Sequence, residues 1–254
     1  MSIEDALSLA REAVEKAGDI ALDHFRRGVE VRAKADASVV TDADLAAEKA
    51  ILDLIEDRDP GVNILAEESG IHDRGHARRW IVDPIDGTRG FTRGGELWGP
   101  LVALEEGGEI IVGAMALPVR GEIYWAARGK GAFKNGQPLR VSDVRTWSQA
   151  TLSLGEATRL LRPPHREGVL ALSDGAVSTR GLGDLAGVTM VVNGWAEAWI
   201  EAGVKPWDLA PSRILVEEAG GRWTTFAGDT DLTRGTAIGS NGHVHDHVLA
   251  AMGG

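Results

Sequence analysis

Four short acidic segments carry the chemistry that this sequence offers. They read T-D-A-D at residues 41–44, E-E at 67–68, D-P-I-D-G-T at 83–88 and W-D at 207–208. Every candidate ligand in them is a hard carboxylate oxygen, and none is Cys or His. Such oxygens suit Mg²⁺ or Mn²⁺ better than zinc or copper. Because these ions usually hold substrate phosphates and activate water, the segments predict metal-assisted chemistry on a phosphate.

The segment at 83–88 is the most informative of the four. Asp83 and Asp86 are three residues apart in a turn that a proline stiffens, so both carboxylates can face one metal cluster. The carbonyl oxygen of Ile85 can add a ligand between them. Gly87 lets the backbone approach an anion closely, and Gly87 and Thr88 stand where a helix could begin. The free N–H groups of such a helix would bind a phosphate.

Each segment alone also has an ordinary structural interpretation. The segment at 83–88 could be a surface turn that ends a strand, and the two acids at 67–68 could simply be solvated. Asp208 could serve as a helix N-cap and nothing more. The prediction of a metal site therefore depends on the segments occurring together.

Taken together, in order and spacing, the segments resemble the inositol monophosphatase family of Mg²⁺-dependent, lithium-sensitive phosphomonoesterases. The family's first signature is a strand followed by D-P-x-D-G-T, and residues 80–91 read W-I-V-D-P-I-D-G-T-R-G-F. Its second is W-D-x-A with a downstream E-A-G-G, matched at 207–210 and 218–221. The upstream text also fits, at 40–44 with Glu48 and at 65–70. The resemblance covers the chain from Lys34 to Gly221 at least.

The resemblance implies a set of metal ligands. Glu67, Asp83 and the carbonyl of Ile85 would hold one Mg²⁺. Asp83, Asp86 and Asp208 would hold a second, so that Asp83 bridges the two ions. A third, weaker ion would depend on Glu67 and water. Two to three Mg²⁺ ions are therefore the expected cofactors, and Mn²⁺ is an alternative.

The resemblance also implies catalytic and phosphate-binding residues. Asp44 and Thr88 match the pair that orients and deprotonates the attacking water, as a carboxylate acting through a hydroxyl can. The amides of Gly87 and Thr88 would hold the phosphate. Lys34 lies near the position of the family's site lysine, although its spacing to Asp44 is one residue short. An ordinary surface lysine is the alternative for Lys34.

The residues around the leaving group are less clear from the sequence. Glu201 lies seven residues before Asp208, where the family commonly places a carboxylate that contacts the leaving group, but a glutamate at a strand end is otherwise usually solvated. Asp184 and Arg180 stand where other members contact substrate hydroxyls. Trp98 is a candidate wall of the leaving-group pocket.

The sequence that follows the first signature favours one branch of the family. Residues 89–99 read R-G-F-T-R-G-G-E-L-W-G, which resembles the histidinol-phosphate phosphatases, as does L-G-D at 182–184. Histidinol phosphate carries an ammonium and an imidazole, so spare acids such as Glu201, Asp184 and Glu96 would suit it. The expected reaction is hydrolysis of L-histidinol phosphate in histidine biosynthesis. Inositol 1-phosphate is the alternative, followed by sugar or nucleotide phosphates.

A second class of function is a catalytically silent metal- or phosphate-binding regulator on the same fold. The sequence argues against it, because every ligand position and both water-activating positions that the resemblance implies are filled. A phosphate-release assay separates the two classes.

Hydrophobic periodicity predicts the elements that must position these residues. Helices are expected at 2–27, 41–57, 207–219 and 246–252, and residues 189–193 fit either a helix or a strand. Strands are expected at 29–34, 62–66, 80–82, 101–104, 110–117, 122–126, 170–172, 198–201, 222–226 and 237–239, with a hairpin turn at Asn135-Gly136. The three histidines at 243, 245 and 247 are expected in a solvated loop and helix cap.

The resemblance implies an α/β layered fold, the αβαβα sandwich of the inositol monophosphatase and fructose-1,6-bisphosphatase-like sugar phosphatases. We expect one domain over 1–254 with two lobes, roughly 1–145 and 146–254, and the family fold implies a homodimer. The seam is expected near 143–150.

Composition limits the remaining possibilities. Of 254 residues, 43% are hydrophobic, which is enough for a substantial core and excludes disorder. The net charge of −11 argues against a nucleic-acid binder. With no cysteine, thiol catalysis and disulfides are excluded. The N-terminus lacks signal-peptide features, and no apolar run reaches membrane-spanning length. A cytoplasmic location, no membrane and a small phosphate-monoester substrate are therefore expected.

Overall fold

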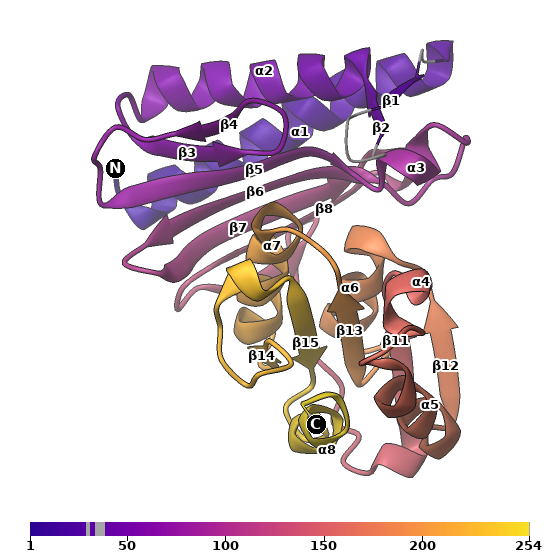
Figure 1. Cartoon of the computed structure of the whole chain (residues 1–254). Helices are drawn as coiled ribbons and strands as arrows, with labels where there is room; N and C mark the ends of the chain where they lie inside the picture. The colour runs from indigo at the N-terminus through magenta and orange to yellow at the C-terminus, as the bar shows by residue number, and fades with distance from the viewer. Residues whose placement is uncertain (29–30, 34–38, 254) are drawn as a thin grey trace.

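The computed structural model describes residues 1–28, 31–33 and 39–253, and its elements stack in five layers (Figure 1). Helices α1 (Ile3–Arg27) and α2 (Asp42–Arg58) cover one face of an eight-stranded sheet. Helices α6 (Asp184–Val192) and α7 (Pro206–Glu218) lie between that sheet and a five-stranded sheet. Helices α5 (Arg166–Gly175) and α8 (His245–Met252) form the last layer. This arrangement confirms the predicted αβαβα sandwich.

Both N-terminal helices begin at capping boxes that the sequence encodes. In α1 the Ser2 hydroxyl accepts from the N–H of Asp5 at 3.1 Å, and the Asp5 carboxylate accepts from Ser2 in return. Thr41 and Asp44 form the same reciprocal pair at the start of α2. Such caps satisfy backbone groups that a helix start leaves without intrahelical partners. The cap of α2 also fixes the orientation of Asp44, a predicted catalytic residue.

The eight-stranded sheet has the order β10-β9-β8-β7-β6-β5-β3-β4. Strand β3 pairs parallel with β5 and the other neighbours pair antiparallel. Its strands are β3 (Asn63–Ala66), β4 (Gly70–His72), β5 (Arg78–Asp86), β6 (Gly99–Glu106), β7 (Glu109–Leu117), β8 (Glu122–Ala127), β9 (Gly131–Lys134) and β10 (Gln137–Pro138). The predicted hairpin turn is confirmed, because Asn135 and Gly136 both have positive φ.

The strand that carries the first signature is longer than expected. It does not end at Val82 but continues as β5 through Asp86, with a shift in its pairing to β6 between Asp83 and Asp86. The proline at 84 cannot donate to a ladder, so an irregularity is needed at this point. The shift turns the two carboxylates out of the regular alternation of a strand.

The five-stranded sheet has the order β12-β11-β13-β15-β14. Strand β11 pairs parallel with both neighbours, and β15 pairs antiparallel with β13 and β14. Its strands are β11 (Thr151–Leu154), β12 (Ser178–Gly181), β13 (Ala198–Ala202), β14 (Arg222–Thr224) and β15 (Thr236–Ser240). The remaining short elements are β1 (Val31–Ala33), β2 (Val39–Thr41), α3 (Thr88–Phe91), α4 (Ala157–Leu160), η1 (Pro118–Arg120), η2 (Trp147–Gln149) and η3 (Leu232–Arg234).

Two predicted elements in the second half need correction or completion. Residues 170–172 were expected as a strand, but they lie inside helix α5, where Val169 and Leu172 bury one side at helical spacing. A three-residue apolar run is too short to show a period. Residues 189–193, which fitted either type, are helical and belong to α6, apart from the capping residue Asn193.

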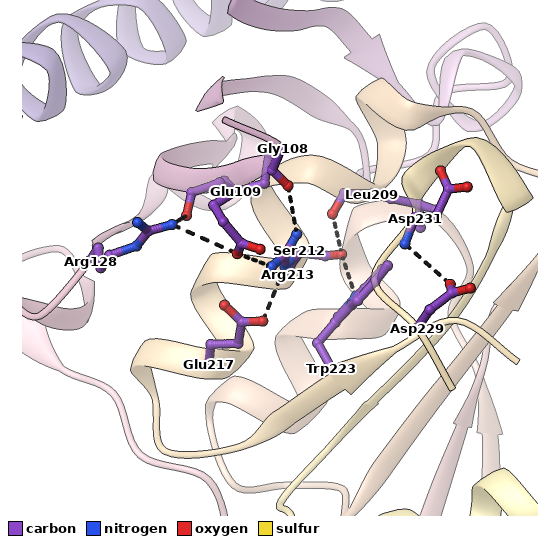
Figure 2. Close-up of polar contacts among 11 residues, drawn as sticks. Gly108, Glu109, Arg128, Leu209, Ser212, Arg213, Glu217, Trp223, Asp229 and Asp231 are labelled. Atoms are coloured by element: carbon purple, nitrogen blue, oxygen red, sulfur yellow. Dashed lines mark hydrogen bonds and ion pairs between the residues drawn. The ribbon is translucent and has the colours of Figure 1, made fainter. Parts of the chain in front are cut away.

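Helix α7 joins the two halves of the molecule. It packs so closely on β7 that a Cβ added at Gly113 would lie 2.5 Å from Ile214. Beside this contact Arg213, 5% exposed, donates to Glu217 and Glu109 and to the carbonyl of Gly108 at the β6–β7 turn (Figure 2). The contact therefore ties α7 to the large sheet.

The two sheets divide near the predicted seam. The last strand of the large sheet ends at Pro138, and the first strand of the smaller sheet begins at Thr151. The division into one domain with two lobes stays a prediction. Among the residues that the structure describes, no helix is both long and apolar enough to span a membrane.

Candidate active site

Carboxylates from three parts of the chain meet at the end of strand β5. Asp83 and Asp86 come from β5 itself, and Asp208 comes from the first turn of α7. Carboxylate oxygens of these three residues all lie within 4.8 Å of one another. Glu67 follows β3, the parallel neighbour of β5, and its N–H donates to the carbonyl of Val82 at 3.1 Å. Parallel pairing thus brings Glu67 to the same sheet edge.

Backbone N–H groups hold the three clustered aspartates in place. The Asp83 carboxylate accepts from the N–H of Ile85 at 2.9 Å. The Asp86 carboxylate accepts from the N–H of Leu185 at 2.5 Å, at the start of α6 in the other half of the molecule. Asp208 is the third residue of α7 and not its N-cap, which is Lys205, but its carboxylate accepts from the N–H of Lys205 at 2.7 Å and so contributes to the cap. The structural and functional interpretations of Asp208 are therefore compatible.

The electrostatics of the cluster favour a cation. Burial raises the pKa of Asp83 well above its ordinary value, and the charges of Glu67, Asp86 and Asp208 raise it further. Burial, then the charges of Asp184 and Asp208, does the same to the pKa of Asp86. Burial also raises the pKa of Asp208 to about 6. Like charges this close cannot all ionise without a compensating positive charge.

The donor set fits a hard divalent ion. Three carboxylates within mutual coordination distance, with a fourth on Glu67 beside Asp83, are typical of Mg²⁺, Mn²⁺ or Ca²⁺ sites. Binding an ion would keep the carboxylates ionised despite their burial. The residues present therefore fit a metal site.

The structure brings Asp44 and Thr88 together. The Thr88 hydroxyl lies 3.3 Å from one Asp44 carboxylate oxygen and 2.8 Å from the carbonyl of Ile85. The other Asp44 oxygen accepts from the N–H and the hydroxyl of Thr41 at 2.7 and 2.6 Å. Asp44 is fully buried. A carboxylate fixed in this way can accept the hydroxyl proton of Thr88 and leave the hydroxyl oxygen free to accept another proton.

An open cleft of about 580 Å³ lies over these groups. Glu67, Gly87, Thr88 and Asp208 line one side of it. Gly87 has φ 82°, and a Cβ there would lie 3.0 Å from the carbonyl of Leu97, so this position requires glycine. Helix α3 begins directly after it, as expected from the sequence. The cleft is large enough for a small phosphate ester.

Comparison with known proteins identifies the family. A model of the inositol monophosphatase family matches residues 2–253. The chain belongs to this family. The histidinol-phosphatase of Chlorobaculum parvum is 40% identical over 97% of this chain and 96% of that protein. The histidinol-phosphatase of Mycobacterium tuberculosis is 37% identical over 98% of each chain.

The solved structures agree with this assignment. The extragenic suppressor protein suhB of Bartonella henselae matches with a TM-score of 0.90 at 28% identity. The match covers 97% of this chain and 98% of that one. The inositol monophosphatase fold predicted from the signatures is therefore confirmed over nearly the whole chain.

In this inositol monophosphatase family member, Glu201 is not solvent-facing. It lies in β13 and is 3% exposed. One carboxylate oxygen accepts from the N–H groups of Glu156 at 2.7 Å and Ala202 at 3.1 Å. Burial raises the pKa of Glu201 to about 8. Glu201 and Asp184, the first residue of α6, both line a smaller cavity, together with Asp86 and Asp208.

Of three other predicted residues, the structure describes two, and neither lines the cleft. Arg180 is exposed on the edge strand β12, where it donates to the carbonyl of Thr179, and it lines neither the cleft nor the smaller cavity. Trp98 is fully buried against Phe25 and Phe91, with ring centroids 5.2 and 4.6 Å away, so it supports the loop from behind. Lys34 lies outside the described residues.

The structure adds residues that the sequence did not single out. Arg89, Glu156, Arg159 and Arg162 line the outer part of the cleft. Short helix α4 carries Arg159, and its sequence has no motif that would have indicated a site. Glu48, which belongs to the upstream motif but had no predicted role, accepts from the N–H groups of Glu68 and Ser69, both at 2.8 Å. It thereby holds the loop that carries Glu67.

Proposed function

We propose that this protein is a Mg²⁺-dependent phosphomonoester hydrolase whose substrate is L-histidinol phosphate. The observation that carries the proposal is the cluster of Asp83, Asp86 and Asp208, next to the Asp44–Thr88 pair, in a chain of this family. The 40% and 37% identity to two histidinol-phosphatases supports the choice of substrate.

Each group in the site has a proposed task. Glu67, Asp83 and the Ile85 carbonyl would hold one Mg²⁺, and Asp83, Asp86 and Asp208 a second, with a third weaker ion at Glu67. Bound Mg²⁺ supplies activation of water and neutralisation of the phosphoryl charge. The N–H groups of Gly87 and Thr88 would bind the phosphate oxygens.

The Asp44–Thr88 pair handles the proton of the attacking water. The Thr88 hydroxyl proton moves toward the Asp44 carboxylate, 3.3 Å away, and the Thr88 oxygen accepts a proton from the water. Water attacks the phosphorus directly, the bond from phosphorus to the ester oxygen breaks, and that oxygen takes up a proton from solvent water to leave as the hydroxyl of histidinol. No phosphoenzyme is expected, because the chain has no cysteine and the site offers no paired His–Asp nucleophile.

Inositol 1-phosphate is the competing substrate, because the family takes its name from that activity. Purified protein should be assayed for phosphate release from both esters at saturating Mg²⁺. A higher kcat/KM on histidinol phosphate is expected. A clear preference for inositol 1-phosphate would overturn the proposed substrate and leave the proposed chemistry intact.

The enzyme class itself is tested by Asp83→Asn. This change removes the proposed bridging carboxylate and one buried negative charge, so phosphate release should fall by at least about 100-fold while the fold remains stable. The stabilisation by Mg²⁺ in thermal unfolding should be lost as well. Full activity in the variant would refute the bridging role, and no release from any small monoester by the parent protein would favour a silent regulator.

A further inference from the structure

The outer part of the open cleft carries more cations than acids, although the chain as a whole has a net charge of −11. Arg89 lies in α3, Arg159 in α4, and Arg162 two residues after the end of α4. Glu156 is the acid that lines the cleft beside them. All four side chains belong to exposed residues, whereas the cleft residues of the metal site and of the Asp44–Thr88 pair are half-buried. A ligand that enters from solvent therefore meets these charges first.

Two of these arginines carry charges that the protein leaves unpaired. Among the residues that the structure describes, the guanidinium groups of Arg159 and Arg162 form no ion pair. Other exposed arginines do form one, since Arg222 and Arg234 each bind an aspartate at 2.6 Å. The positive charge of Arg159 and Arg162 is therefore available to a ligand.

The acid in this region does not cancel that charge. The Glu156 carboxylate accepts from the N–H of Thr158 at 2.9 Å and binds neither guanidinium. The hydrogen bonds from Thr158 lower the pKa of Glu156 most, and the charges of Arg89 and Arg159 lower it further. The field of the arginines thus extends across the mouth of the cleft, where one acid faces three cations.

The backbone makes room for Arg159 on the wall of the cleft. A Cβ added at Gly203 would lie 2.9 Å from Arg159 Cδ and 3.2 Å from its Nε. Gly203 has φ 76°, which a residue with a side chain rarely adopts, and it lies in the loop between β13 and α7. The stem of Arg159 therefore packs on the loop that leads to Asp208, and its charge is placed beside the entrance to the metal site.

We propose that Arg159 and Arg162 form an arginine rim that attracts the phosphate dianion of the substrate into the cleft. The inference rests on the proposed function and deepens it by naming residues that govern substrate capture. A cleft whose entrance carries one sign of charge raises the local concentration of an oppositely charged ligand. The acidic remainder of the molecule repels a dianion, so the rim offsets this repulsion at the point of entry.

The test removes both charges in the double variant Arg159→Gln/Arg162→Gln. At low salt, its KM on histidinol phosphate should rise about tenfold, the lower end of the range for electrostatic focusing. The kcat should change little, because neither side chain takes part in the proposed chemistry. Calorimetric titration with inorganic phosphate, in the presence of Mg²⁺, should show the same weakening. Arg159→Lys/Arg162→Lys keeps both charges and should restore most of the affinity.

Salt separates attraction by charge from a structural effect. At about 1 M KCl the Debye length falls to about 3 Å, so the field of an exposed arginine is screened before it reaches the ligand. The KM values of the parent protein and of the Arg159→Gln/Arg162→Gln variant should then converge. A KM that rises equally at low and at high salt would overturn the proposal.

The matched control removes two arginines elsewhere on the surface. Arg145 and Arg166 are exposed and do not line the cleft. Arg145→Gln/Arg166→Gln changes the net charge by the same amount and should leave KM and phosphate affinity unchanged. Equal weakening in both double variants would mean that net charge alone matters, and the rim would be wrong. Thermal unfolding of each variant checks that the fold is retained.

The outcomes distinguish the rim from the proposed function. If the parent protein hydrolyses histidinol phosphate and Arg159→Gln/Arg162→Gln keeps its KM and phosphate affinity, the rim is wrong and the function stands. If the parent protein binds inorganic phosphate but does not hydrolyse histidinol phosphate, and the same variant binds phosphate more weakly, the proposed substrate is wrong and the rim stands.

Discussion

At the scale of residues, the site depends on negative charges held closer than water would allow. Asp83, Asp86 and Asp208 are brought within 4.8 Å of one another, and burial prevents solvent from screening their repulsion. Without a cation, the pKa values of Asp83 and Asp86 are raised, so keeping both carboxylates ionised costs free energy. A bound metal ion would offset this cost. The proposed catalytic pair is built differently, because one Asp44 oxygen accepts from the N–H and the hydroxyl of Thr41 and the other faces Thr88.

Replacing Thr88 by alanine tests the proton path. Thr88→Ala removes the hydroxyl between Asp44 and the attacking water but leaves the backbone N–H groups and the carboxylate cluster in place. Because general-base assistance typically contributes 10²–10⁴-fold, kcat should fall by roughly 100-fold or more. Steady-state phosphate release measures the effect. Thr88→Ser, which keeps a hydroxyl, is the control and should retain most of the activity.

At the scale of elements, carboxylates that accept two backbone N–H groups hold the loops around the site. Glu48 on α2 holds the loop after β3, and Glu201 on β13 holds the start of α4. Glu218 accepts from Gly129 and Gly131 at 2.8 Å each, so the E-A-G-G signature ties the end of α7 to the turn before β9. That part of the second signature is therefore structural.

Glu48→Gln tests whether such a loop positions a metal ligand. A glutamine keeps one acceptor oxygen but turns an amide NH₂ toward a backbone N–H, so the loop that carries Glu67 should shift. The Mg²⁺ concentration for half-maximal activity should rise roughly tenfold, as with other outer-shell changes. Calorimetric titration with Mg²⁺ in the absence of substrate should show the same weakening.

The matched control lies on the same helix. Asp53 is exposed on α2 and pairs with Lys49 at 2.7 Å, far less buried than Glu48. Asp53→Asn should leave the Mg²⁺ dependence unchanged. Equal effects of the two changes would contradict a positioning role for Glu48.

Helix α8 begins at His245, and the expectation of a solvated loop and helix cap is wrong for this residue. His245 is fully buried, and its ring nitrogens contact the hydroxyls of Thr224 and Ser240, both at 2.9 Å. Burial lowers the pKa of His245 to about 4. Hydroxyls can serve either tautomer, so a neutral histidine is satisfied between the two strands.

This burial predicts a pH-dependent contribution to stability. The unfolded chain takes up a proton on His245 near pH 6.5, whereas the folded protein resists it until about pH 4. Burial of the neutral His245 ring therefore contributes fully to the free energy of unfolding above pH 6.5. This contribution is lost as the pH falls toward 4, by at most about 1.4 kcal/mol per pH unit. In chemical denaturation, the free energy of unfolding should fall less steeply between pH 6.5 and pH 4 in His245→Gln than in the parent protein. The exposed His243→Gln should leave the profile unchanged.

At the scale of the whole molecule, the candidate active site depends on α7, which packs against both sheets. The helix packs closely on β7 at Gly113, and Asp208 in its first turn lies beside the aspartates of β5. The bond from Leu185 to Asp86 adds a second link between the halves. The expected homodimer and cytoplasmic location stay predictions.

The contact between α7 and the large sheet can be weakened by a substitution outside the candidate active site. Arg213→Ala removes the guanidinium that binds Glu109, Glu217 and the carbonyl of Gly108 (Figure 2). Since Arg213 is nearly buried but both glutamates are partly solvated, the loss in unfolding free energy should be about 2 kcal/mol. Arg128→Ala removes an exposed partner of the same Glu109 and should cost well under 1 kcal/mol. Denaturant titration distinguishes the two.

The sequence by itself determined the local parts of this protein. The helix start at Gly87 and Thr88 and the hairpin at Asn135-Gly136 depend on neighbouring residues, so their types and spacing were sufficient to predict them. The signatures also indicated the family and, through it, the layered fold. The prediction of a strand at 170–172 was wrong because a run of three apolar residues is too short to show a hydrophobic period.

Only the tertiary structure decided which residues, far apart in the sequence, line the same cleft or cavity. Arg180 looked suitable but lies on an outer edge strand, whereas Arg159 and Arg162 line the cleft. Glu201 is buried in β13, although a glutamate at a strand end is usually solvated. These outcomes follow from how α6 and α7 pack between two sheets, and packing between segments far apart in the chain leaves no local pattern in the sequence.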